Sequence, residues 1–290
     1  MVKIFRYNPK ILLNHTIFFI FVSSILSSLL YIPEERDLDI YIMIFTIIIA
    51  IYLIYIFGGY MYLYFKYMKT RCNSLKEFIN LLLTDKVFRT LMANMFSAFW
   101  AFIYGLFTHV MFLLSKSYFY IFVEEIYFLI ALIKIYMIMH INSFEIKKKK
   151  IDNLIALFLT VVSSAVLICA NMIYLQKGTF TKYDILIYAY ALYAFYALIS
   201  GIYSFIKAYK THNVVRIRFF LVKSGCAIFS MYVLMVCLLN QFSKNPNDTL
   251  IYQLLGGIMA SVAIFIIAVG IVFKLVKNNH NDKKNEKLLQ

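Results

Sequence analysis

The chain has 290 residues, of which 63% are hydrophobic and only 15% are charged, and its formal net charge at pH 7 is +15. A soluble domain of this length needs a polar surface, and about 25% of its residues are usually charged. Apolar runs of the ~20 residues that a helix needs to cross ~30 Å of hydrocarbon recur along the whole chain. The composition therefore excludes an ordinary soluble domain and predicts an all-α, polytopic membrane protein.

The residue usage also points to a source. Ile, Tyr, Phe, Lys and Asn are abundant, whereas the chain holds 9 Gly and 3 Pro. Because the codons of the abundant group are rich in A and T, we expect an AT-rich genome. We further expect the source to be a bacterium and the protein to lie in its plasma membrane. The 24 Tyr and 28 Phe then reflect composition, and we expect most of them to pack or to face lipid rather than to bind a ligand.

Eight hydrophobic segments predict eight membrane-spanning helices, with boundaries accurate to a few residues. None contains proline, so none has to be kinked for that reason. The first follows the basic stretch MVKIFRYNPK and imitates a signal peptide, whose cleavage would leave seven spans. We favour an uncleaved span, because its apolar stretch is long and no A-x-A site ends it. The predicted ranges are 11–32, 40–65, 90–114, 118–141, 154–175, 185–206, 219–241 and 250–273.

The basic residues predict the orientation. With eight spans, 22 of the 29 Lys and Arg fall on the side that holds both termini. Since Lys and Arg are retained in the cytoplasm, we expect both termini inside, with a single membrane domain at 1–275 and a short basic cytoplasmic tail at 276–290. The 22 residues are Lys3, Arg6, Lys10, Lys66, Lys69, Arg71, Lys76, Lys86, Arg89, Lys147, Lys148, Lys149, Lys150, Lys207, Lys210, Arg216, Arg218, Lys274, Lys277, Lys283, Lys284 and Lys287.

A short amphipathic helix is predicted between the second and third spans, at about 75–84. Ser74 and Glu77 have the spacing of a capping box, which starts a helix. The apolar residues that follow recur on one helical face, which predicts a helix lying in the inner head-group layer. The alternative is that this segment extends the third span into the cytoplasm.

The third and fourth spans carry ionisable residues. The short loop between them makes the two helices antiparallel neighbours, which brings His109 to the depth of Glu124 and Glu125 in the outer half of the membrane. Ionisable groups at such a depth indicate a function, here a proton-sensitive or cation-binding site. In the alternative, the fourth span begins near Ile126 and both glutamates lie in the outer loop. We expect Lys134 to extend its side chain to the inner interface.

Two spans carry faces of small residues, which let a neighbouring helix approach closely. We expect helix packing from both faces, with the lining of a channel as the alternative. The faces consist of Ala194, Ala197, Gly201 and Ser204 in the sixth span, and of Gly256, Gly257, Ala260 and Ser261 in the eighth.

Enzyme and metal signatures are missing from the sequence. The stretch EEIYFLI begins like the EExxxR of intramembrane proteases, but no arginine follows. No GxSxG, HExxH, P-loop or clustered metal-ligand set appears, and the four cysteines lack metal-type spacing. We therefore expect no enzyme, metal or cofactor. We also expect no nucleic acid, because anionic lipid head groups suffice to attract the basic loops.

Two stretches carry a resemblance to a known family, FSAFWAFIYGLF (96–107) and YSFIKAYKTHNVVRIRFFLVKSG (203–225). Through them, residues 40–275 resemble the seven-transmembrane sensory region of bacterial histidine kinases and related receptors. Trp100 and Tyr104 match that family's pattern, whereas Ile103 and Phe107 replace its Gly and Glu.

The family's output module has no counterpart after residue 274. The resemblance thus implies a receptor-like or regulatory protein that senses a signal and passes it to a cytoplasmic or membrane protein partner. The alternative function is a transporter or channel subunit that moves a small solute or ion.

Overall fold

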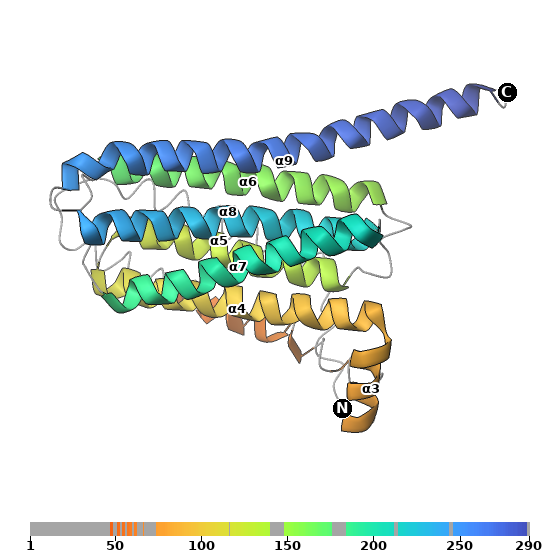
Figure 1. Cartoon of the computed structure of the whole chain (residues 1–290), viewed down its shortest axis with the longest axis horizontal. Coiled ribbons are helices and arrows are strands. Elements are labelled where there is room, and N and C mark those ends of the chain that lie inside the picture. The colour runs from red at the N-terminus through yellow and green to blue at the C-terminus, as the bar shows by residue number, and fades with distance from the viewer. Residues whose placement is uncertain are drawn as a thin grey trace. The chain divides into compact units, whose positions relative to one another are not determined.

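The structure is a computed structural model, and its described residues are almost all helical, with no strand among them (Figure 1). The helices are α3 (Leu75–Thr84), α4 (Lys86–Ser115), α5 (Tyr118–Met139), α6 (Lys148–Leu175), α7 (Asp184–Thr211), α8 (Val214–Phe242) and α9 (Pro246–Leu288). The described residues are 47–48, 51–52, 54–55, 57–59, 61–62, 66, 74–115, 117–139, 148–175, 184–211, 214–243 and 246–288.

The all-α prediction is confirmed for these residues. Six of the predicted spans, from 90–114 onward, each fall largely within one helix from α4 to α9. The predicted span 11–32 lies outside the described residues. The span 40–65 is described in part, and its described residues are helical.

Within the described residues, five helices are long and apolar enough to cross a membrane, namely α4, α6, α7, α8 and α9. Helix α5 has 22 residues, which corresponds to about 33 Å and would also cross a bilayer. It differs from the other five in carrying Glu124, Glu125 and Lys134 among its apolar residues. The structure thus supports a multi-pass helical membrane protein.

The chain divides into two units, Met1–Met139 and His140–Gln290. In the first unit, α3 is a helix separate from α4, as the capping box predicted. The Ser74 hydroxyl accepts a hydrogen bond from the Glu77 N–H at 3.2 Å, and Asp85 ends the helix in an extended conformation. The Asp85 carboxylate then accepts a hydrogen bond from the Phe88 N–H at 3.2 Å, at the start of α4. The alternative, that α3 only extends the next span, is wrong.

Helix α3 runs crosswise to α4 at the beginning of that helix (Figure 1). Phe78 packs edge-on against Phe88 of α4, with ring centroids 5.6 Å apart. Ile79 and Leu83 remain exposed on an adjacent side of α3. The helix therefore uses only part of its apolar surface to pack on α4.

The second unit contains α6 to α9, and α9 lies close against α6 and α8. A Cβ added at Gly257 would lie 2.3 Å from the Cβ of Ala170 on α6, a distance that real Cβ atoms do not reach. Ser163 of α6 and Ser261 of α9 each donate a hydrogen bond to the backbone carbonyl of the other at 2.9 Å. The eighth-span face of small residues thus lies at helix contacts.

The sixth-span face of small residues packs on α8. Ala194 and Ala197 are buried, and Gly201 lies with its Cβ position 3.8 Å from the Cβ of Ala227. Ser204 accepts a hydrogen bond from the Lys223 ammonium at 3.2 Å. This face therefore brings α7 and α8 together.

Helix α9 has 43 residues and runs without a break to Leu288. Its last turns project beyond the ends of α6 and α8 (Figure 1). Most of the segment predicted as a tail, 276–290, is therefore a continuation of this helix.

Candidate functional site

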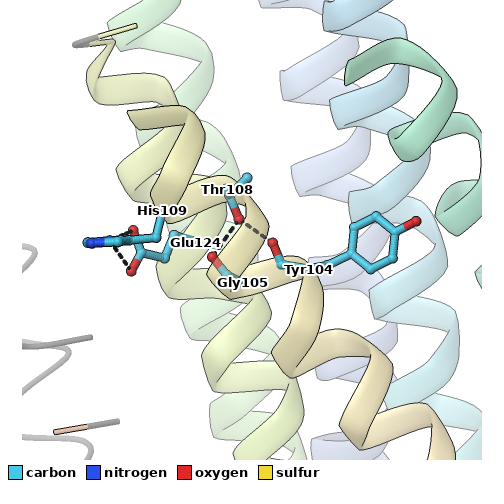
Figure 2. Close-up of polar contacts among 5 residues, drawn as sticks. All are labelled: Tyr104, Gly105, Thr108, His109 and Glu124. Atoms are coloured by element: carbon cyan, nitrogen blue, oxygen red, sulfur yellow. Dashed lines mark hydrogen bonds and ion pairs between the residues drawn. The ribbon is translucent and has the colours of Figure 1, made fainter. Parts of the chain in front are cut away.

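The α4–α5 hairpin brings His109 and Glu124 into contact. The Nδ1 atom of His109 lies 2.9 Å from both carboxylate oxygens of Glu124 (Figure 2). Both residues are buried, with 6% of His109 and 4% of Glu124 exposed. His109 lies six residues before the end of α4 and Glu124 six residues after the start of α5, so the two belong to the same level of the hairpin.

One helical turn further from the α4–α5 turn, a second contact fixes the register of the two helices. Gly105 lies against the ring of Phe128, and a Cβ at Gly105 would come within 2.7 Å of the ring. Gly105 precedes His109 by four residues, and Phe128 follows Glu124 by four, so the ring contact and the polar contact are stacked along the hairpin. The absence of a side chain at Gly105 thus helps to set the meeting of His109 with Glu124.

The backbone of α4 next to His109 is also polar. The Thr108 hydroxyl donates hydrogen bonds to the carbonyl oxygens of Tyr104 at 2.5 Å and Gly105 at 3.0 Å (Figure 2). Such bonds compete with the helical bonds of the same carbonyls and often bend helices. The buried hydroxyl of Thr108 thus has its hydrogen-bond partners within α4.

The placement of the two glutamates decides between the alternatives left by the sequence. Helix α5 begins at Tyr118 rather than near Ile126, so the interpretation that leaves both glutamates in a loop is wrong. Glu125 is half-buried. As the next residue on the helix it points about 100° away from Glu124. The structure thus pairs His109 with one of the two predicted carboxylates.

The chemistry of the pair follows from the number of protons that its carboxyl group and its imidazole ring hold together. A carboxylate beside an imidazolium, or a carboxylic acid beside a neutral imidazole, carries no net charge. Removal of one proton leaves a net charge of −1 in a buried place, where an uncompensated charge is costly. A cation would offset that charge. The pair can therefore take up either a proton or a cation, and its hydrogen bonding changes when it does.

Lys134 lies ten residues beyond Glu124 on α5, which is about 15 Å along the helix axis. Only 2% of Lys134 is exposed, and its ammonium donates a hydrogen bond to the Ser97 hydroxyl of α4 at 2.9 Å. The expectation that Lys134 extends to the interface is therefore wrong. The hydroxyl on the facing helix gives the ammonium a hydrogen-bond partner inside the hairpin.

Aromatic rings follow α4 away from the pair. The rings of Trp100 and Tyr104 lie 6.5 Å apart, and Tyr104 lies 6.1 Å from Tyr127 of α5. Tyr104 points away from His109, toward the opposite side of α4 (Figure 2). Trp100, nine residues before His109, therefore belongs with Tyr104 to a ring cluster on the side of α4 away from the pair.

An ion pair between the buried Arg218 and the half-buried Asp152 in the second unit was not anticipated. The Arg218 guanidinium donates two hydrogen bonds to the Asp152 carboxylate, from Nε at 2.5 Å and from Nη2 at 3.0 Å. Arg218 is 1% exposed and belongs to α8, not to a cytoplasmic loop. The sequence feature that could have indicated this pair is Asp152, the one acidic residue between Glu145 and Asp184.

Among the described residues, no three His, Cys, Asp or Glu side chains gather at one place. Cys169 and Cys226 are buried and Cys237 is half-buried, and these three cysteines form no disulfide.

Comparisons of the chain with protein-family models, with curated proteins and with solved structures give no match. The functional argument therefore depends on the geometry of the chain itself.

Proposed function

We propose that the protein is a membrane sensor or regulatory protein whose detecting group is the His109–Glu124 pair. The observation that carries this proposal is the contact itself, a buried acid and imidazole 2.9 Å apart on facing helices. Binding of a proton or cation changes the charge of the pair, and the helices that hold it must adjust to that change. With no catalytic motif in the sequence, the signal would pass to a cytoplasmic or membrane protein partner.

The proposed topology has eight spans in the plasma membrane of a bacterium, with both termini in the cytoplasm. In this arrangement the α4–α5 turn faces outward and the pair lies about 9 Å from the helix ends. Helix α3 lies along the inner surface, where its exposed Ile79 and Leu83 meet lipid. The cations where α6 begins, α7 ends and α8 begins support this orientation.

The level of the pair favours a sensor over a transporter. Substrate and ion sites of transporters lie near the middle of the bilayer. The pair lies near one end of its hairpin, and Lys134, a buried ionisable residue further along α5, already donates to Ser97. Proton or cation binding near one surface suits detection of conditions on that side.

Trp100 provides a direct test, because it is the single tryptophan of the chain. We expect its fluorescence in liposomes to follow the outer pH through one transition. The transition should move in pH in Glu124→Gln and in His109→Gln, because each variant leaves one titratable group without its partner. Glu125→Gln is the matched control, one residue along the same helix, and should keep it. An unchanged titration in both pair variants would refute the proposal.

A flux measurement separates the alternative. Proteoliposomes that carry an internal pH dye should show no proton or cation uptake above that of empty liposomes. Uptake that is present in the wild-type protein and lost in Glu124→Gln would identify a transporter or channel subunit instead.

The orientation has a separate test. A peptide tag after Gln290 should be inaccessible to antibody or protease in intact cells and accessible after the cells are opened. Accessibility in intact cells would reverse the assignment of inner and outer ends.

A further inference from the structure

The geometry points to a binding site for the phosphate group of an anionic phospholipid where α7 ends and α8 begins. The site is formed by Lys207 and Lys210 of α7 and Arg216 of α8, with the exposed last turns of α7 holding the acyl chains. It belongs to the second unit and does not depend on the His109–Glu124 pair.

The charge of the α7–α8 hairpin is concentrated at this end. Between Asp184 and Asp248 the chain has no acidic residue. The basic residues of α7 and α8 all lie within a stretch of 17 residues around the turn between the helices. They are Lys207, Lys210, Arg216, Arg218 and Lys223.

The acidic side chain that α6 brings to this end is already engaged. Asp152 accepts two hydrogen bonds from Arg218, so this carboxylate offsets the charge of one buried arginine. Nearby, Lys150 in the first turn of α6 is exposed and adds a further positive charge. The hairpin end therefore keeps an excess of positive charge, which an anion complements.

The cations lie at graded depths along the α7–α8 hairpin. Lys223 is buried and donates to Ser204, whereas the Lys207 ammonium donates to the Tyr203 hydroxyl at 3.2 Å and lies 5.1 Å from the centre of that ring. Lys210 is exposed, and Arg216 is half-buried in the first turns of α8. This places the accessible cations at the end of the helices, where lipid phosphates lie if the hairpin spans the membrane.

An apolar strip on the same part of α7 favours a lipid over a soluble phosphate. Tyr203 is 62% exposed, Ile206 47% and Tyr209 72%, and these residues follow one another at a spacing of three, which makes them neighbours on the helix surface. Tyrosine is enriched at membrane interfaces, where its ring meets lipid and its hydroxyl meets water. A free phosphate ion would leave such an apolar strip exposed, whereas the acyl chains of a lipid would cover it.

The test compares lipids that differ in charge. The full-length protein is purified from mixed micelles that contain phosphatidylglycerol and phosphatidylcholine, and the retained lipids are counted by native mass spectrometry. We expect preferential retention of phosphatidylglycerol that falls about fivefold for each cation removed in Lys210→Gln/Arg216→Gln. The matched control is Lys76→Gln/Arg89→Gln, which removes two exposed cations of the first unit and should keep the preference.

Two further measurements keep the result decisive if the double variant folds poorly. The charge-preserving variant Lys210→Arg/Arg216→Lys should retain phosphatidylglycerol, and for the wild-type protein the preference should weaken at high salt, because salt screens exposed charges. Equal retention of both lipids by the wild-type protein would overturn the proposal. So would a preference that Lys210→Gln/Arg216→Gln leaves intact, or displacement of the lipid by millimolar inorganic phosphate.

Discussion

The two units of the chain bury different charged side chains, and each buried charge meets a partner on another helix. In the first unit, Glu124 and Lys134 lie well inside α5, and each meets a side chain of α4. In the second unit, the buried Arg218 of α8 meets the half-buried Asp152 of α6, and the buried Lys223 donates to Ser204 of α7. Among the described residues, a buried carboxyl group meets a buried imidazole in the first unit alone, and ionisable groups within spanning helices need such partners.

Where α9 packs on α6, the second unit has small and hydroxyl-bearing residues at the contact instead of charges. Gly257 and Ser261 of α9 lie against Ala170 and Ser163 of α6. Close packing of this kind gives a rigid framework, because it leaves little room for alternative side-chain arrangements. The comparison suggests that the second unit is mainly a framework and that the first unit contains the groups able to respond to a proton or cation.

The largest loss of stability is expected from breaking the ion pair of the second unit. Asp152→Asn leaves Arg218 buried without its counter-charge, and loss of one partner of a buried pair costs about 3 to 5 kcal/mol of unfolding free energy. Equilibrium unfolding of the protein in mixed micelles measures the loss. The double variant Asp152→Leu/Arg218→Leu should recover most of the stability, since it removes both charges. A single variant as stable as wild type would show that the pair does not support the framework.

The next effect tests the closeness of α6 and α9. Gly257→Ala places a methyl group 2.3 Å from the Cβ of Ala170 and should cost about 1 to 3 kcal/mol, because the helices must move apart. Gly270→Ala is the matched control on the same helix, since no atom lies within 4 Å of its Cβ position. Thermal unfolding of the two variants measures their losses of stability. Equal losses would contradict the close contact of α6 and α9.

A smaller effect is expected at the glycine of the first unit. Gly105→Ala meets the ring of Phe128, a side chain that can shift, so we expect a loss of about 1 kcal/mol. Because the ring contact lies one turn from the pair, the variant should also displace the midpoint of the Trp100 titration. An unchanged midpoint would mean that the Gly105–Phe128 contact does not position His109 and Glu124.

The smallest effect concerns the serine contact between α6 and α9. Ser163→Ala removes hydrogen bonds to Ser261, and such interhelical bonds contribute on average about 0.6 kcal/mol within membranes. Ser164→Ala, which removes a bond to the carbonyl of Thr160 in the same helix, serves as the control. Unfolding experiments that find a larger loss for Ser164→Ala would contradict the role of this contact.

Much of the helical architecture could be predicted because it depends on local properties. The apolar runs of α4 to α9 and the capping box at Ser74 are readable along the chain. The shared depth of His109 and Glu124 also followed from local information, since the turn between their helices is short. The small residues of α7 indicated a packing face by their spacing alone.

The partners of the buried charges could not be predicted in the same way. That Lys134 meets Ser97, or that Asp152 meets Arg218, depends on the rotation of each helix about its axis and on the register between helices. Nearly every position of these helices is apolar, so hydropathy does not mark the face that each helix turns inward. The start of α5 was uncertain for a related reason, because two adjacent glutamates fit the end of a span as well as its interior.

By itself the sequence determined that this is a helical membrane protein, where its described helices run and at which level of a hairpin its acid and imidazole lie, because hydrophobicity and loop length act locally along the chain. The tertiary structure decided that Glu124 rather than Glu125 meets His109, and that the side chains of Lys134 and Arg218 are buried between helices. These choices depend on side chains that are far apart in the chain and meet only when the helices pack.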